Sequence, residues 1–130
     1  MKIVIDTSIL IAVIIGEEEK PLIIEKTKNS ELIAPYSVHW EIVNALSAIL
    51  KKHKINIKDI NKAINIYSKI PIEYIDVDLR HSLELCDKYN IYAYDAYILS
   101  CALKNKLVLF SLDKKINEIA KELEIKFIKV

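Results

Sequence analysis

Residues 2–8 read KIVIDTS, and this stretch decides the fold. Its β-branched residues are typical of a buried strand, which ends at the acid Asp6. Thr7 or Ser8 can cap a helix that runs to Gly16, because glycine suits the exit of a helix. The chain therefore opens with a strand that leads at once into a helix.

The rest of the chain continues this alternation of strands and helices. Apolar residues recur at three- and four-residue steps in the expected helices, and short apolar runs mark the expected strands. Further helices are expected at residues 18–28, 37–53, 58–70, 79–89, 94–105 and 114–123, and further strands at residues 31–34, 73–77, 107–110 and 125–130. Such alternation predicts an α/β fold with a mostly parallel sheet of about five strands flanked by helices. Because no repeat or linker interrupts it, residues 1–130 are expected to form a single domain.

Length and charge restrict the class of protein. A chain of 130 residues with 52% hydrophobic residues is long enough to bury a core without disulfides or a structural metal. The 19 basic side chains nearly balance the 18 acidic ones, which leaves a formal net charge of +1. This balance argues against a strongly basic nucleic-acid binder, although a local patch can still bind nucleic acid.

The cysteines and the apolar runs indicate the compartment. Cys86 and Cys101 lack the neighbouring Cys or His residues of a zinc site, and two cysteines do not make a secreted disulfide framework. The longest apolar run, residues 9–15, is far shorter than the roughly 20 residues that cross a bilayer. We therefore expect a soluble cytoplasmic protein without a membrane segment.

Four acidic residues stand where the predicted fold can bring them together. Asp6 and Asp113 follow two predicted strands, and the carboxyl ends of parallel strands form the usual site of an open sheet. Glu41 and Asp95 interrupt apolar helical stretches, where a carboxylate is costly to bury unless it is paired or binds a metal. Taken singly, Asp95 can simply complement a helix dipole and Glu41 can face solvent. Four converging carboxylates, however, repel one another, and a hard divalent cation such as Mg²⁺ or Mn²⁺ relieves that repulsion.

Four short motifs contain these acids in order along the chain. They are IVIDTS (3–8), EIVNAL (41–46), YDA (94–96) and SLD (111–113). In these motifs the chain resembles the PIN-domain ribonucleases, and it most resembles the VapC-type toxins of toxin–antitoxin operons. The resemblance extends over essentially the whole chain. Ser111 stands where the family more often has Thr, and Lys114 and Lys115 stand where some relatives have a further acid.

The resemblance implies a three-layer α/β/α PIN-like fold and metal-dependent hydrolysis of RNA phosphodiester bonds. It implies that Asp6, Glu41, Asp95 and Asp113 hold one or two Mg²⁺ or Mn²⁺ ions. A divalent ion can lower the pKa of water and stabilise charge on an attacked phosphate, so no Ser, Cys or His nucleophile is required. A VapC-type toxin further implies an RNA substrate, a homodimer and a cognate antitoxin protein.

Three neighbouring polar residues are candidates for orienting the carboxylates. Thr7 and Ser111 each adjoin an acid and can hydrogen-bond to a carboxylate, although Thr7 can also cap a helix and Ser111 can belong to a turn. Asn44 follows Glu41 by three residues on the same helix face, where it can orient the carboxylate or be a surface amide. The triplet EEE at residues 17–19 is expected to be a solvated helix start.

Other classes of protein stay open at this point. A housekeeping PIN nuclease of RNA processing or decay shares the motifs, and a non-catalytic PIN-like module is expected to lack acids that are all present here. A phosphotransfer receiver requires paired acids near the first strand, and an aspartyl-phosphate phosphatase requires DxD there, whereas residues 6–8 read DTS. We therefore expect a metal-dependent ribonuclease. The toxin is preferred because a 130-residue chain without an accessory domain matches a stand-alone toxin.

Overall fold

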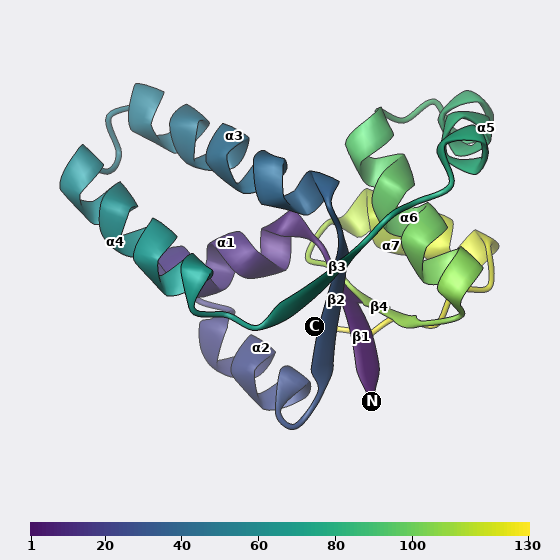
Figure 1. Ribbon diagram of the computed structural model, residues 1–130, viewed down its shortest axis with the longest axis horizontal. Helices are drawn as coiled ribbons and strands as arrows, with labels where there is room; N and C mark the ends of the chain where they lie inside the picture. Colours follow the sequence, from purple (N-terminus) through teal and green to yellow (C-terminus); the bar gives the residue numbers. More distant parts are fainter.

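The computed structural model describes residues 1–130 (Figure 1). Strands and helices alternate along the chain, as the sequence pattern predicts. In chain order the elements are β1 (Lys2–Ile5), α1 (Thr7–Ile15), α2 (Lys20–Thr27), β2 (Glu31–Pro35), α3 (Ser37–Lys51), α4 (Ile57–Ser68), β3 (Ile72–Ile75), α5 (Leu79–Tyr89), α6 (Ala93–Asn105), β4 (Val108–Phe110) and α7 (Lys114–Glu122).

The four strands form one parallel sheet in the order β3-β2-β1-β4. In the centrally placed β1, residues Ile3, Val4 and Ile5 are buried, as a continuous apolar strand predicts. Helices α1–α4 lie on one side of the sheet and α5–α7 on the other, which gives three layers (Figure 1). The expected α/β/α fold is thus confirmed. Because all strands are parallel, their carboxyl ends meet at one edge of the sheet.

The expectation of a fifth strand at residues 125–130 is wrong. There the chain makes only an isolated parallel bridge, between Leu109 and Phe127. The N–H of Leu109 donates to the carbonyl of Lys126, and the N–H of Ile128 donates to the carbonyl of Leu109, each at 2.9 Å. The neighbouring strand β4 is only three residues long, so it offers too short an edge for a longer ladder.

Other boundaries shift by one or two residues, and two of these shifts have a local reason. The helix expected from residue 18 begins at Lys20, with Pro21 in its first turn, where the missing N–H of proline costs nothing. The strand expected at residues 73–77 ends at Ile75, because the chain turns there to place Asp78 as the N-cap of α5.

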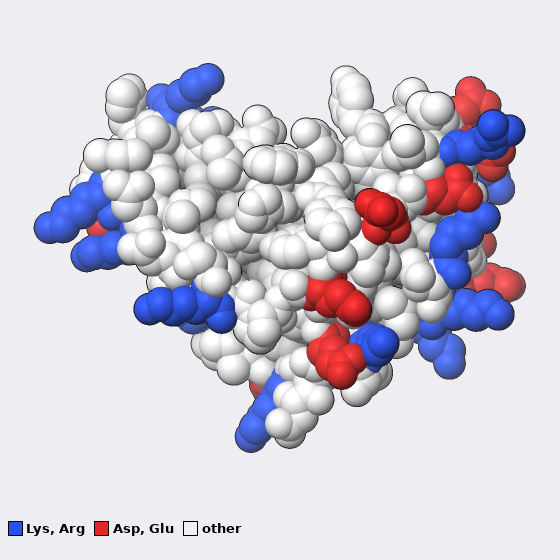
Figure 2. Space-filling view, viewed as in Figure 1, with Lys and Arg blue, Asp and Glu red and all other residues white.

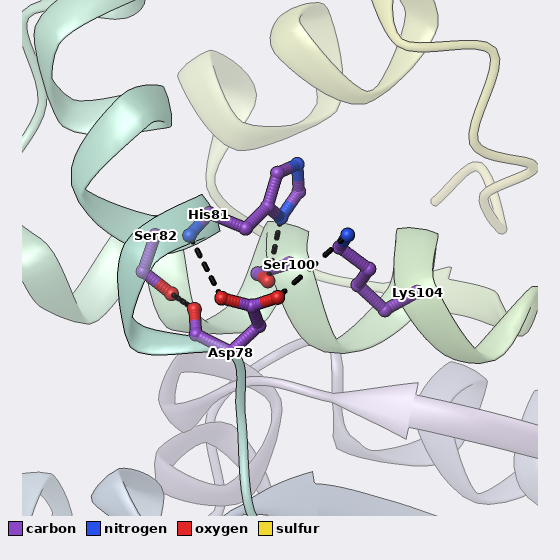
Figure 3. A network of polar contacts seen from close by, with 5 residues as sticks. All are labelled: Asp78, His81, Ser82, Ser100 and Lys104. Atoms are coloured by element: carbon purple, nitrogen blue, oxygen red, sulfur yellow. Dashed lines mark hydrogen bonds and ion pairs between the residues drawn. The ribbon is translucent and has the colours of Figure 1, made fainter.

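A polar network joins α5 to α6, the helix that carries Asp95 (Figure 3). The carboxylate of Asp78 accepts from the N–H of His81 at 2.9 Å and pairs with Lys104 of α6 at 3.7 Å. The ring Nδ1 of His81 lies 2.7 Å from the hydroxyl of Ser100, which is buried in α6. These contacts fix α6 in position from the side away from the sheet.

Neither a membrane helix nor a disulfide contributes to this fold. No helix is long and apolar enough to cross a bilayer. Cys86 and Cys101 are both free thiols, and burial in α6 raises the pKa of Cys101 to about 12. Cys101 therefore behaves as a small buried apolar residue.

Candidate active site

A cavity of about 530 Å³ lies at the carboxyl ends of the strands, between the start of α1, the helices α3 and α6, and the start of α7. The surface is visibly hollowed between the lobe of α3 and α4 and the lobe of α5 and α6 (Figure 2). The lining of the cavity contains all the acids singled out from the sequence, Asp6, Glu41, Asp95 and Asp113. Residues that are far apart in the chain thus meet at one site, each brought there by a different element.

Asp6 is the most buried of these acids, with 4% of its surface exposed. It is itself the N-cap of α1, where its carboxylate accepts from the N–H of Ile9 at 3.3 Å, so the prediction that Thr7 or Ser8 caps this helix is wrong. The hydroxyls of Ser8 and Ser111 also donate to its carboxylate. Burial nevertheless raises the pKa of Asp6 to about 6, against the lowering effect of these hydrogen bonds.

Glu41 reaches the cavity from the second turn of α3. The hydroxyl of the buried Thr7 donates a hydrogen bond to its carboxylate, so Thr7 contacts an acid and does not cap a helix. Burial raises the pKa of Glu41, the hydrogen bond from Thr7 lowers it, and the charge of Asp95 raises it further. The two carboxylates are therefore near enough to repel each other.

The other two acids of the cavity are Asp95 and Asp113. Asp95 lies half-buried in the first turn of α6, where burial and then the charge of Asp113 raise its pKa, while Lys115 opposes the rise. Asp113 is exposed and caps α7, because one carboxylate oxygen accepts from the N–H groups of Lys115 and Ile116 at 2.9 and 3.1 Å. Its other oxygen has no partner within the protein and is free for a ligand.

Ser111 lies behind the acids and is fully buried. Its hydroxyl donates to Asp6 and accepts from the N–H of Asp113 at 2.9 Å. The hydroxyl of Ser8 plays a similar part, since it donates to Asp6 and accepts from the N–H of Leu112 at 2.9 Å. This role of Ser8 was not predicted from the sequence. The position of Ser8 two residues after Asp6 could have indicated that its hydroxyl reaches the carboxylate.

Asn44, the candidate on α3 for orienting Glu41, does not line the cavity. Its side chain is exposed, and Ala45 lines the cavity instead. Successive residues of an α-helix are about 100° apart, so a residue four positions after Glu41 is nearer to its direction than one three positions after it. Asn44 is therefore exposed on α3, and its role in orienting Glu41 stays a prediction.

Glu17 and Glu19 also line the cavity, although the sequence placed them in a solvated helix start. The chain leaves α1 through Gly16 in the left-handed conformation (φ 87°), which turns the acids back toward the site. The lining includes no Lys, Arg or His. The cavity is therefore strongly acidic, and Lys115 is the cation that acts on it from outside its lining.

The donor chemistry of the cavity fits a hard divalent cation. Its carboxylates offer only oxygen ligands, and burial and mutual repulsion hold the pKa values of Asp6, Glu41 and Asp95 above their usual range. No three acidic, His or Cys side chains lie close enough together in this structure to hold a metal ion. The acids thus surround the cavity at a distance from one another. The cations that suit such a site are Mg²⁺ and Mn²⁺, because they retain several water ligands.

The sequence profile of the PIN domain matches residues 3–122, nearly the whole chain. The chain belongs to the PIN domain family. The matched residues include the four acids that line the cavity, and the α/β/α fold of the chain is the PIN fold. No curated protein matches the chain in sequence.

The chain is also similar in fold to solved structures. PAE2754 from Pyrobaculum aerophilum superposes with a TM-score of 0.63 at 16% identity, over 95% of this chain and 98% of that one. VapBC2 from Rickettsia felis, bound to a DNA fragment from its promoter, contains a chain that superposes with a TM-score of 0.67 at 17% identity, over 99% of this chain and 98% of that one. At these identities the likeness is one of fold alone.

Proposed function

We propose that this PIN-domain protein is a ribonuclease that depends on Mg²⁺ or Mn²⁺ and hydrolyses RNA phosphodiester bonds. One observation carries the proposal: four carboxylates from four separate parts of the chain line a single cavity that contains no Lys, Arg or His. A purely structural role does not explain why burial and repulsion are tolerated there, since each raised pKa reports a carboxylate whose charged form is disfavoured.

In this proposal the four acids Asp6, Glu41, Asp95 and Asp113 hold one or two cations. A divalent cation, when bound, activates water and stabilises negative charge on the attacked phosphate. Thr7 holds the carboxylate of Glu41 by a hydrogen bond, and Ser111 holds that of Asp6. Such partners fix the orientation of metal-binding carboxylates and so maintain their geometry.

The hydroxyl groups of the cavity support direct attack by water. Apart from Tyr94, the hydroxyl residues of the lining are Thr7 and Ser8, and each donates a hydrogen bond to a carboxylate. Each of these carboxylates is also needed for the proposed cation, and the lining contains no His to act as a separate general base for a serine or threonine nucleophile. A covalent intermediate is therefore disfavoured.

Cleavage of a labelled RNA tests the catalytic assignment. We expect cleavage with Mn²⁺, none with EDTA, and a loss of at least 100-fold in Asp6→Asn and in Asp95→Asn, because each removes a cation ligand. Asp87→Asn, which changes an exposed acid of α5 outside the cavity, is the matched control and is expected to cleave as the wild type does. An Asp6→Asn variant as active as the control contradicts the assignment and favours the non-catalytic module.

We further propose that the protein is the toxin of a toxin–antitoxin pair, acts on cytoplasmic RNA and is inhibited by a cognate antitoxin protein. The support is the likeness in fold to a chain of the VapBC2 structure. Induced expression in a bacterial host is then expected to stop growth, while Asp6→Asn does not. If neither the wild type nor Asp6→Asn affects growth, the result favours a housekeeping PIN nuclease of RNA processing or decay.

An apolar surface supports the proposed homodimer. Trp40 and Val43 of α3 and Leu79 and Leu83 of α5 are each more than half exposed, with Trp40 and Leu83 at 68%. The surface over α3 is largely free of charged side chains (Figure 2). Light scattering at micromolar concentration is expected to give twice the chain mass of 15.0 kDa, and Leu83→Glu is expected to give the monomer. A wild-type monomer contradicts the dimer without affecting the catalytic assignment.

A further inference from the structure

The side chain of Asn117 makes an unusual contact behind the acidic cavity. Asn117 lies in α7, where its backbone N–H donates to the carbonyl of Asp113 at 3.1 Å. Its side-chain amide Nδ2 turns back out of the helix and donates to the carbonyl of Ser111 at 3.0 Å. This hydrogen bond joins the two ends of the segment from Ser111 to Asn117. The side chain of Asn117 does not line the cavity.

The residues held by this contact lead directly to the acids. The hydroxyl of Ser111 donates to Asp6 and accepts from the N–H of Asp113. The peptide between Ser111 and Leu112 carries the Ser111 carbonyl and the Leu112 N–H, so its rotation would also break the bond from Leu112 to the hydroxyl of Ser8, the other side chain that donates to Asp6. The bond from Asn117 to the Ser111 carbonyl opposes that rotation.

Asn117 also has a feature that stability alone does not explain. Its Oδ1 atom is buried and has no hydrogen-bond partner in the protein. A buried amide with one unpaired end is unfavourable, and an apolar side chain of the same shape avoids that cost. Only the Nδ2 donor of this amide makes a hydrogen bond, and its acceptor is the carbonyl of Ser111.

We propose that Asn117 is a positioning residue for the cation site, acting through Ser111 on Asp6 and through the same turn on Asp113. The proposal rests on the ribonuclease function proposed above and extends it to a residue outside the cavity. Asn117 touches neither substrate nor cation in this role. Its contribution is to keep the hydroxyl of Ser111 and the carboxylate of Asp113 in fixed positions relative to Asp6.

Asn117→Leu, which preserves the size of the side chain and removes the donor, tests the proposal. We expect the half-saturating Mn²⁺ concentration to rise roughly tenfold, by calorimetry and by cleavage rate, since partners of metal ligands carry effects of that size. The KM for RNA is expected to stay within about twofold and the melting temperature in EDTA to stay equal or rise, because the unpaired Oδ1 is removed as well. A merely structural residue has the opposite signature: a lower melting temperature with unchanged Mn²⁺ affinity.

A matched control and a double variant make the test specific. Asn105→Leu removes the same kind of bond, from Nδ2 to the carbonyl of Cys101 at 2.8 Å, at the end of α6 and away from the cavity. It is expected to leave Mn²⁺ binding and cleavage unchanged. In the Ser111→Ala background, Asn117→Leu is expected to add little, because residues that act through one another are not additive.

Three results overturn the proposal: wild-type Mn²⁺ affinity in Asn117→Leu, an equal effect in Asn105→Leu, or multiplied effects in the double variant with Ser111→Ala. If Asn117→Leu does not fold, Asn117→Ala takes its place with the same criteria. A wild-type chain that cleaves no RNA refutes the ribonuclease function, while calorimetry with Mn²⁺ still decides the role of Asn117. The two failures are therefore distinguishable.

Discussion

The hydroxyl of Thr7, in the first turn of α1, donates a hydrogen bond to the carboxylate of Glu41 on α3, 34 residues further along the chain. Thr7 is buried, with 8% of its surface exposed. The bond lowers the pKa of Glu41 against the raising effects of burial and of Asp95. Thr7 thus helps to keep ionised a carboxylate that the proposed cation requires.

Thr7→Val is expected to lower cleavage more at pH 6 than at pH 8. Without the hydroxyl the pKa of Glu41 rises further, so the carboxylate is protonated over a wider range of acidic pH. The acidic limb of the pH–rate profile should shift to higher pH. Loss of the hydrogen bond should also lower the free energy of unfolding by about 1 kcal/mol. Thr27→Val, which removes a hydroxyl bound to the carbonyl of Ile23 on α2, controls for the loss of any such bond. Parallel pH profiles for the wild type and Thr7→Val contradict the expectation.

Asp6 is expected to make the metal-free protein less stable as the pH rises. Its pKa is raised from 3.8 to about 6 in the folded chain, so the folded state favours the protonated acid. The stabilisation is complete below the unfolded pKa and is lost as the pH rises through about 6, with a total on the order of 3 kcal/mol at most. Melting in EDTA should show Asp6→Asn to be more stable than the wild type at pH 8, with a smaller difference at pH 4. An equal dependence on pH in both proteins refutes this assignment.

Much of the site was predictable from the sequence because strand ends and helix interruptions are local patterns. Asp6 and Asp113 follow buried strands, and a parallel sheet brings such positions to one edge. Glu41 and Asp95 stand out because an acid in an apolar helix needs a partner. All four consequently line the cavity.

The errors come from tertiary detail that local patterns do not contain. The strand expected at residues 125–130 depends on the length of its neighbour β4, which ends after three residues. Whether Asn44 or Ala45 faces the cavity depends on a few tens of degrees of helix rotation. Glu17 and Glu19 enter the lining only because Gly16 turns the chain back toward the site.

Divalent cations are expected to stabilise the protein at neutral pH and to do so weakly at pH 5. A ligand at one hundred times its dissociation constant stabilises the folded state by about 2.7 kcal/mol. At pH 5 protons compete, because burial and neighbouring charge raise the pKa values of Asp6, Glu41 and Asp95. Thermal melting with Mn²⁺ at both pH values measures this effect. Asp95→Asn should show little stabilisation at either pH, and an equal rise in that variant would place the cation elsewhere.

Glu17 and Glu19 are expected to weaken RNA binding without taking part in the reaction. They line the cavity beside the four acids, so their charges repel the phosphates of an incoming strand. Glu17→Gln with Glu19→Gln should therefore lower the KM for RNA several-fold and leave kcat nearly unchanged, with a difference that shrinks at high salt because exposed charges are screened. Glu18→Gln is the matched control, since Glu18 is an exposed acid between the two that does not line the cavity. If Glu18→Gln lowers the KM as much as the double variant does, the effect belongs to net charge and not to the cavity. If kcat falls together with the KM, the two acids belong to the set that holds the cation.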